Sequence, residues 1–319
     1  MRALVLGGTG WLGRAIVRDL IAAGVEVTCL ARGESGAVPE GARFVRADRL
    51  AADAYESVRG EWDEVIELSS EPELVEPALA ELADTAAHRT LVSTVSVYAR
   101  NDEPGADESA TLVEPTNLAE YADANVAAER SSTARLGARL LIARPGLIVG
   151  PGDPSDRFGY WPARLSRRGP ALIPTTAGRF VQVIDVADLS AWLSRAARDG
   201  HVGVANAVGD VMPMSTFFER VSAVTHFDGA FEEVEDEVLL AHDVRYWAGP
   251  RSLPLWLPLS DAAMAQRSAR IFQQMIGRVR PLESTVADVL EDERFRGLDR
   301  PRRSGLSAAE ESSVLQDVR

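Results

Sequence analysis

Glycines in the first thirteen positions of the chain have the type and spacing that bind phosphate. The string Gly7-Gly8-Thr9-Gly10-Trp11-Leu12-Gly13 directly follows the apolar run Ala3–Leu6 and precedes an amphipathic stretch. A strand, a glycine turn and a helix in this order are typical of dinucleotide binding, and a ligand-free glycine loop is the less favoured alternative. Gly7 permits a tight turn, Gly10 permits close approach of a diphosphate, and Gly13 permits close packing of the helix on the strand. We expect the diphosphate at the positive N-terminus of this helix, and the residues predicted to bind the cofactor there are Gly7, Thr9, Gly10, Trp11, Leu12 and Gly13.

The end of the second predicted strand indicates which dinucleotide binds. In NAD sites an acidic residue at this place bonds the ribose 2′-hydroxyl. Here Leu30 and Ala31 are followed by Arg32, whose guanidinium matches a 2′-phosphate in charge and in fork geometry. NADP(H) is therefore favoured over NAD(H). Asp48, after a short third strand, is a candidate for contact with the adenine edge.

The elements that position these residues are predicted from alternating apolar patterns. Strand patterns occupy residues 3–6, 25–30, 43–45, 64–68, 90–95 and 140–143, and helical patterns occupy residues 11–23, 74–87 and 118–136. Alternation of this kind implies right-handed crossovers and a parallel sheet covered on both faces. We therefore predict an α/β fold, a doubly wound Rossmann-type parallel sheet with a smaller substrate-side region.

The alternation stops after Gly150, where turn residues and then aromatic and arginine-rich sequence follow. A strand at 180–184 and a helix at 186–198 resume it briefly. We predict a dinucleotide-binding Rossmann domain at 1–150 and about 176–204, and a substrate-side region at 151–175 and about 205–295. The last predicted region is a polar C-terminal tail at 296–319. The composition of this tail is typical of a segment that is partly disordered or wraps a partner.

Composition argues against several classes of protein. A formal net charge of −14 argues against a nucleic-acid partner, RNA included. No apolar run approaches the roughly 18 residues that cross a bilayer, and no signal peptide is recognised, so we expect no membrane insertion. The only cysteine, Cys29, excludes an internal disulfide and favours a reducing cytoplasm. This cysteine and the four histidines lack metal-ligand spacing, so no metal site is predicted.

Further segments stand in a specific order along the chain. They are the glycine string, Val92–Tyr98, Tyr121 within its helix, and Arg144-Pro145-Gly146 running into Gly150-Pro151-Gly152-Asp153. In this order and spacing the chain resembles the extended short-chain dehydrogenase/reductase family, in particular its NAD-dependent epimerase/dehydratase branch. The resemblance covers most of residues 1–290.

The resemblance implies roles for individual residues. Thr94 corresponds to the Ser or Thr that hydrogen-bonds the substrate oxygen. Tyr121 corresponds to the tyrosine that exchanges a proton with that oxygen while hydride moves to or from the nicotinamide. Pro145 and its neighbours correspond to the stretch that lies against the nicotinamide. Ser96 is a weaker candidate to assist Thr94, because strand alternation puts both on one face.

The family's lysine, expected one helical turn after the tyrosine, is replaced by Asn125, and all 34 basic side chains of the chain are arginine. A neighbouring ammonium lowers the pKa of a tyrosine, whereas a free phenol of pKa about 10 is ionised in roughly one molecule in a thousand at pH 7. Oxidation of an alcohol needs the tyrosinate, and reduction of a carbonyl uses the neutral phenol. We therefore expect any redox chemistry, with Asn125 in place of the lysine, to run as reduction. Arg100 and Arg144 are candidates to supply the missing charge.

Aromatic and arginine side chains are concentrated between Asp156 and Leu165. The candidates for substrate contact are Arg157, Tyr160 and Trp161, which could stack on a ring and hold an anionic group. A structural lid or packed loop is an equal alternative.

Three functions agree with this sequence. The leading one is an NADPH-dependent reductase of a small-molecule carbonyl or related group. The second is a sugar-nucleotide epimerase or dehydratase, and the third is a catalytically silent protein that binds NADP(H) as a sensor or scaffold. A homodimer through the predicted helices 74–87 and 118–136 is a further expectation from the family.

Overall fold

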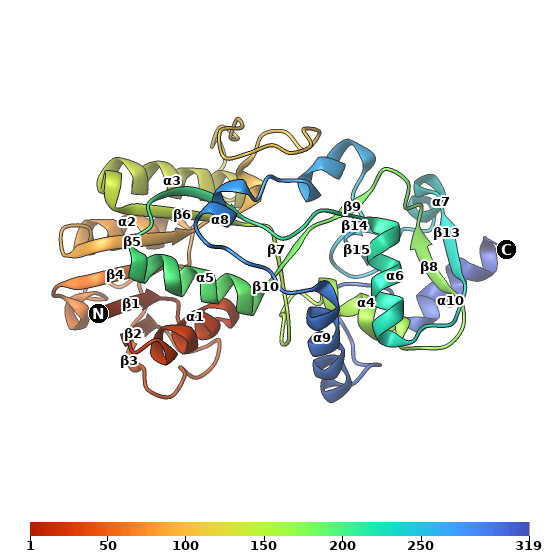
Figure 1. Cartoon of the computed structure of the whole chain (residues 1–319), viewed down its shortest axis with the longest axis horizontal. Coiled ribbons are helices and arrows are strands. Elements are labelled where there is room, and N and C mark those ends of the chain that lie inside the picture. Colours follow the sequence, from red (N-terminus) through yellow and green to blue (C-terminus); the bar gives the residue numbers. More distant parts are fainter. Residues whose placement is uncertain (319) are drawn as a thin grey trace. The chain divides into compact units, whose positions relative to one another are not determined.

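A computed structural model of the chain describes residues 1–318 (Figure 1). The chain divides into two compact units. The first unit comprises Met1–Ile148, Val186–Gly209 and Arg267–Arg278, and the second comprises Val149–Asp185, Asp210–Gln266 and the chain from Val279 onward.

The first unit is built on a seven-stranded sheet in the order β11-β6-β5-β4-β1-β2-β3. Its strands are β1 (Arg2–Leu6), β2 (Glu26–Ala31), β3 (Arg43–Arg46), β4 (Trp62–Glu67), β5 (Ala86–Val92), β6 (Leu140–Pro145) and β11 (Gly203–Ala207). Every pairing between neighbouring strands is parallel. This arrangement confirms the predicted doubly wound α/β fold.

Helices cover both faces of this sheet (Figure 1). Those of the first unit are α1 (Trp11–Ala22), α2 (Pro72–Leu82), α3 (Tyr121–Leu136), α5 (Val186–Asp199) and α8 (Arg270–Gln274). Helices α1 and α5 pack together on one face, and α2 and α3 pack together on the other. Because both faces are covered, β1 is apolar almost throughout, and Ala3 to Leu6 are fully buried.

The boundaries of several elements of the first unit differ from the predicted ones. The strand predicted at 90–95 runs from Ala86 to Val92, so Thr94 and Ser96 follow it and do not alternate along a strand. Two helix boundaries have clear causes. The predicted helix 74–87 ends at Leu82, because the chain from Thr85 joins the sheet: the Thr85 carbonyl accepts the Trp62 N–H at 2.9 Å, and Ala86 pairs with Trp62. Helix α3 begins at Tyr121 rather than at residue 118, because Asp123 accepts the N–H groups of Thr116 and Asn117 and holds this segment in a turn. Both boundaries depend on partners that periodicity does not reveal.

The second unit combines helices with short strands. Its helices are α4 (Arg157–Leu165), α6 (Met214–Thr225), α7 (Asp236–Ala241), α9 (Leu282–Arg296) and α10 (Ala308–Asp317), and its paired strands are β8 (Ala171–Pro174) with β13 (Phe231–Val234), β9 (Phe180–Val181) with β12 (Met212–Pro213), and β14 (Arg245–Trp247) with β15 (Ser252–Pro254). The predicted strand at 180–184 is divided between β9 and β10 (Val183–Asp185), and neither belongs to the seven-stranded sheet. The short strand β7 (Leu147–Val149) pairs with β10. An aromatic core holds this unit together, with Trp161 and Phe218 ring centroids 4.7 Å apart.

The predicted domain limits differ from the observed units at several places. Residues 149–150 and 176–185 lie in the second unit, residues 205–209 and 267–278 lie in the first, and residues 296–318 belong to the second unit, where they include α10. Buried charge explains the last difference. Arg300 donates to Asp156 at 2.5 Å and to Glu293 at 2.8 Å, and Arg302 donates to Glu293 at 2.6 Å. Arg300 and Arg302 of this segment therefore pair with buried carboxylates.

Within residues 1–318, no helix is long and apolar enough to span a bilayer. The same residues include no cluster of three or more His, Cys, Asp or Glu side chains that could hold a metal ion.

Candidate functional site

A tight glycine turn joins β1 to α1 at the carboxyl end of the sheet. Gly7 has φ +95°, a conformation that glycine adopts without steric cost. Its N–H donates to the Leu30 carbonyl at 3.1 Å, and the Gly10 N–H donates back to the Gly7 carbonyl at 3.0 Å. The turn is thereby held against β2 and directs the chain into α1.

The other glycines of the turn differ in what a side chain would meet. A Cβ on Gly13 would lie 2.5 Å from the Gly7 carbonyl oxygen, and one on Gly8 would lie 2.6 Å from the Cys29 sulfur. A Cβ on Gly10 would meet only the Gly7 oxygen, at 3.4 Å. Gly8 and Gly13 are therefore needed for packing, whereas Gly10 leaves the surface of the turn open to a ligand.

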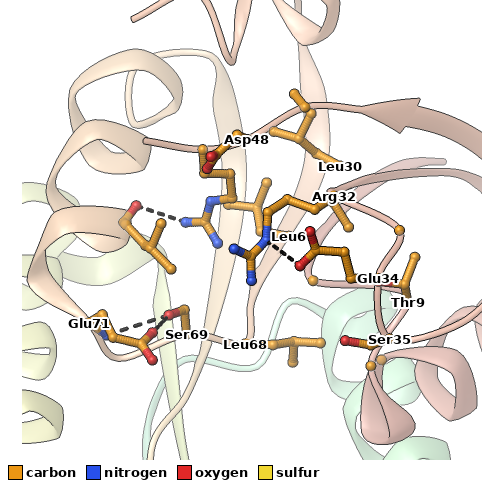
Figure 2. Close-up of a pocket in the computed structure, with 18 of the residues that line it drawn as sticks. Leu6, Thr9, Leu30, Arg32, Glu34, Ser35, Asp48, Leu68, Ser69 and Glu71 are labelled. Atoms are coloured by element: carbon orange, nitrogen blue, oxygen red, sulfur yellow. Dashed lines mark hydrogen bonds and ion pairs between the residues drawn. The ribbon is translucent and has the colours of Figure 1, made fainter. Parts of the chain in front are cut away.

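A cavity of about 500 Å³ opens over this turn (Figure 2). Every cofactor residue predicted from the turn lines it, and so do Arg32 and Asp48. The N-terminus of α1 also faces this cavity; its first turn holds no acidic residue, and Gly10 provides no side-chain cap. No side chain of the helix's own first turn therefore compensates the positive end of its dipole, which leaves it available to an anionic diphosphate.

The part of the cavity beyond the ends of β2 and β3 contains charges of both signs. Arg32, whose side chain is 62 % exposed, pairs with Glu34 at 3.3 Å (Figure 2). Asp48 accepts the Leu50 N–H at 3.1 Å. Glu34 also lines the cavity and was not predicted from the sequence, because it lies three residues beyond the end of β2 rather than at it.

Arg49 is a second lining residue that the sequence did not predict. It donates two hydrogen bonds to Glu67, at 2.9 and 2.6 Å, and one to the Leu74 carbonyl at 2.8 Å. Burial acts to lower the pKa of this guanidinium, but the Glu67 carboxylate outweighs it and raises the pKa. Arg49 thus lines the cavity with a side chain that its ion pair holds in place. Its position directly after Asp48 was the only sequence feature that indicated a place in the cavity.

Thr94 follows the carboxyl end of β5 and begins the short 3₁₀ turn η2 (Val95–Val97). Its hydroxyl accepts the Ser96 N–H at 3.1 Å and donates to the Ser96 hydroxyl at 3.2 Å. Thr94 is buried and Ser96 is half-buried. The structure therefore brings these two predicted residues together as a hydrogen-bonded pair.

Tyr121 is the first residue of α3, and its side chain is 60 % exposed. Helix α3 ends just before β6, which runs parallel to β5, so the helix must start at the carboxyl edge of the sheet. Val126, farther along the helix, packs in one cluster with Val95 and Val97. Tyr121 thus lies at the same sheet edge as Thr94, with a phenol open to solvent.

Asn125 occupies the position one turn after Tyr121. It is 2 % exposed, and its side-chain amide donates to the Tyr121 carbonyl at 2.8 Å. The side chain at this position is thus a neutral group that is bonded to the helix backbone.

Neither candidate arginine offers a free charge in place of the lysine. Arg144 donates to both oxygens of Glu129, at 2.9 and 2.7 Å, and to the Tyr98 hydroxyl at 3.0 Å. Burial acts to lower the pKa of Arg144, yet Glu129 raises it. Arg100 is exposed and pairs with Asp102 at 3.0 Å. Each guanidinium is therefore balanced by a carboxylate.

The remaining predicted residues fall in two places. Pro145 is the last residue of β6, also at the carboxyl edge of the sheet. Arg157, Tyr160 and Trp161 lie on α4 in the second unit, where Arg157 stacks on the Trp247 ring at 5.2 Å. Trp161 is fully buried and donates to the Pro254 carbonyl at 2.8 Å, and burial raises the pKa of Tyr160. These two aromatic side chains thus belong to the packed interior of that unit.

Comparison with known proteins gives one family and several relatives. The model of the "NAD dependent epimerase/dehydratase family" matches residues 3–209. A curated relative, the 2′-dehydrokanamycin reductase of Streptomyces kanamyceticus, is 27% identical over 89% of this chain and 83% of its own. Among solved structures, the UDP-glucose 4-epimerase of Thermus thermophilus in complex with NAD is 18% identical, with a TM-score of 0.64 over 93% of this chain and 99% of that one. The UDP-glucuronic acid 4-epimerase of Bacillus cereus in complex with NAD is 13% identical, with a TM-score of 0.67 over the same shares.

The solved structures share the fold, and the family model covers the sheet, the glycine turn and the carboxyl edge described above. This chain belongs to the NAD-dependent epimerase/dehydratase family.

Proposed function

We propose that this protein is a reductase that uses NADPH to reduce a carbonyl group of a small molecule. The observation that carries the proposal is the environment of Tyr121: an exposed phenol at the carboxyl edge of the sheet, followed one turn later by a neutral, buried Asn125. The relative from Streptomyces, which is named as a reductase, supports the same direction of reaction.

The cavity suits a nicotinamide dinucleotide. The α1 N-terminus and the open Gly10 surface would hold the diphosphate, and Asp48 would face the adenine edge. Pro145 is not among the residues that line this cavity, but it ends β6 at the carboxyl edge of the sheet, where it would lie against the nicotinamide. When bound, the reduced nicotinamide supplies hydride. Arg32 would receive the 2′-phosphate of NADP(H), because its exposed ion pair with Glu34 is worth no more than about 1 kcal/mol and a phosphate dianion can displace it.

The residues at the carboxyl edge of the sheet would bind the substrate oxygen and donate a proton to it. The Thr94 hydroxyl, with Ser96 beside it, would donate a hydrogen bond to the carbonyl oxygen of the substrate. The Tyr121 phenol would donate its proton to that oxygen as charge develops on it. The neutral amide of Asn125 gives no electrostatic support to a tyrosinate, whereas reduction of a carbonyl uses the neutral phenol as general acid.

The test compares the two directions of the reaction. Purified protein is assayed near pH 7 against a panel of ketones with NADPH, including 2′-dehydrokanamycin, and against the matching alcohols with NADP⁺. We expect ketone reduction to exceed alcohol oxidation, and Tyr121→Phe to lower reduction by about 10²- to 10⁴-fold while cofactor affinity is unchanged. Alcohol oxidation that outpaces reduction would contradict the proposal.

A sugar-nucleotide epimerase is the second candidate, and Glu34 favours it. A carboxylate at this end of the cavity could bond the ribose 2′-hydroxyl of NAD. Such an enzyme is expected to retain tightly bound NAD after purification, which mass spectrometry of the denatured protein detects. A silent sensor would bind NADP(H) but reduce no ketone, and Tyr121→Phe would then change nothing.

A further inference from the structure

A second cavity, of about 340 Å³, lies in the second unit between α4 and α10. It shares no residue with the dinucleotide cavity. Its lining includes three arginines, Arg164, Arg167 and Arg168, and a single carboxylate, Glu311. A local excess of arginine is unexpected in a chain with a net charge of −14.

The carboxylate of Glu311 is fully engaged. One oxygen accepts the Arg164 Nε–H at 2.5 Å, and the other accepts the Leu172 N–H at 3.0 Å. Arg164 is only 5 % exposed, and it also donates to the Pro170 carbonyl. Its Nη1 is buried and has no hydrogen-bond partner among the residues that the structure describes. Glu311 thus balances the charge of Arg164 and leaves one of its buried donors unsatisfied.

The other two arginines carry the excess charge. Arg167 donates to the Leu298 carbonyl at 2.7 Å and pairs with Asp299 at 2.8 Å, but the Asp299 side chain is 92 % exposed. The Nε of Arg167 is buried without a partner in the described part of the chain. Arg168 is exposed and makes no ion pair with any residue between 1 and 318. Since an unsatisfied buried donor on a charged group is costly, a ligand that accepts hydrogen bonds would be stabilised here.

We propose that this cavity is a binding site for a small oxyanion, a phosphate or carboxylate group carried by a small molecule. The planar guanidinium groups match the geometry and charge of such a group. The Ser312 hydroxyl and the Gln316 amide, which also line the cavity, supply additional neutral donors. This proposal does not rest on the redox function proposed above, because all residues of the site belong to the second unit and none lines the dinucleotide cavity.

Calorimetric titration of the full chain with sodium phosphate and with sodium citrate tests the proposal at constant ionic strength, with chloride as the reference anion. Saturating NADPH is present in a parallel series, so that anion binding at the α1 N-terminus can be distinguished. We expect saturable binding of at least one of the two anions. Phosphate alone indicates a phosphate-bearing ligand, and citrate alone indicates a carboxylate.

Two variants locate the binding. Arg168→Ala, at an exposed position, should weaken anion binding by about tenfold or more, and Arg168→Glu should abolish it. Arg294→Ala, which removes an exposed arginine of the second unit that lines neither cavity, is the matched control and should leave this binding unchanged. The proposal is overturned if neither anion binds above chloride, or if binding survives Arg168→Glu. Circular dichroism of the variants checks that the fold is retained.

Discussion

At the scale of single residues, the proposed reaction direction depends on the neutral Asn125 one turn after Tyr121, at the position where the family resemblance predicts a lysine. The Asn125 amide donates a hydrogen bond to the Tyr121 carbonyl, and the guanidinium of Arg144 donates to both carboxylate oxygens of Glu129. No cation that the structure describes at these positions is therefore available to stabilise a tyrosinate.

Restoring the lysine should change the balance between the two directions. We expect Asn125→Lys to raise alcohol oxidation near pH 7 by about tenfold or more relative to ketone reduction, because an ammonium favours the phenolate. Initial rates in both directions from pH 6 to 10 measure this. Asn125→Gln, which changes length without adding charge, is the control. An equal effect of both substitutions would assign the change to packing rather than charge.

Arg32 and Glu34 should control the choice of cofactor in opposite senses. Arg32→Ala is expected to weaken NADPH binding by about tenfold with little effect on NADH, since only NADPH carries the 2′-phosphate. Glu34→Gln removes the competing carboxylate and is expected to tighten NADPH binding. Dissociation constants from calorimetry provide the measurement. If NADH affinity falls in Glu34→Gln while Arg32→Ala leaves NADPH unaffected, the cofactor is NAD(H).

At the scale of elements, the glycines of the β1–α1 turn have different roles: Gly13 is needed for packing, whereas Gly10 leaves room for a ligand. Gly13→Ala places a Cβ 2.5 Å from the Gly7 carbonyl, and we expect it to cost about 1–3 kcal/mol of the free energy of unfolding. Gly10→Ala meets only one atom, at 3.4 Å, so it should fold normally and lose affinity for the dinucleotide. Urea unfolding and cofactor titration of both variants test this contrast, which fails if Gly10→Ala is the less stable of the two.

The pair of strands β4 and β5 contains a buried charge that predicts a pH dependence. Glu64 on β4 bonds His88 on β5, whose other ring nitrogen lies 2.7 Å from the His201 carbonyl. Burial acts to lower the pKa of His88, but the bond to Glu64 outweighs it and raises the pKa above the ordinary 6.5; burial itself raises the pKa of Glu64. The folded pair therefore holds a proton that the unfolded chain has released.

It follows that this pair stabilises the fold fully below pH 6.5 and that the contribution is lost as pH rises through the raised pKa of His88. One proton changes the free energy of unfolding by at most about 1.4 kcal/mol per pH unit. Urea unfolding from pH 6 to 9, for the natural chain and for His88→Gln, measures this contribution as a difference. That difference should shrink with rising pH, and a constant difference would exclude a role for the proton.

At the scale of the whole molecule, the C-terminal segment completes the second unit. Asp156 is 4 % exposed and accepts from Arg296 at 3.1 Å and from Arg300 at 2.5 Å. Burial acts to raise the pKa of Asp156, and Arg300 outweighs it, so that the pKa lies below 3.8. The contribution of this carboxylate to stability is therefore present above pH 3.8 and lost as pH falls below it.

Asp156→Asn should cost about 3–5 kcal/mol at pH 7, because it leaves partly buried guanidinium groups uncompensated. Asp299→Asn is the matched control: the Asp299 carboxylate also pairs with an arginine, but its side chain is 92 % exposed, so its loss should cost less than about 1 kcal/mol. Urea unfolding followed by tryptophan fluorescence measures both. Equal costs would mean that burial does not determine the strength of these pairs.

The homodimer expected from the family remains a prediction. The exposed side of α2 carries Glu73, Glu76 and Glu81, and Arg135 of α3 pairs with Asp84 at 2.8 Å. An interface through these two helices would have to cover charged side chains and is expected to be sensitive to salt.

The sequence by itself determined six of the seven strands of the sheet, the glycine turn and the order of the site residues along the chain, whereas β11 (Gly203–Ala207) was not predicted. These features depend on local apolar patterns and on the backbone conformations that glycine can adopt, and residues close together in the sequence determine both. The start of β5 could not be predicted in this way, because residues 85 and 86 become strand through pairing with Trp62.

Only the tertiary structure decided the environments of the charges. Glu34 beside Arg32, Glu129 beneath Arg144, and Asp156 among the C-terminal arginines are pairs between residues that folding brings together. Burial likewise made Tyr160 and Trp161 core residues, although their composition was equally compatible with substrate contact. The physical reason is that Coulomb and desolvation energies depend on distance and burial in space, which spacing along the chain does not specify.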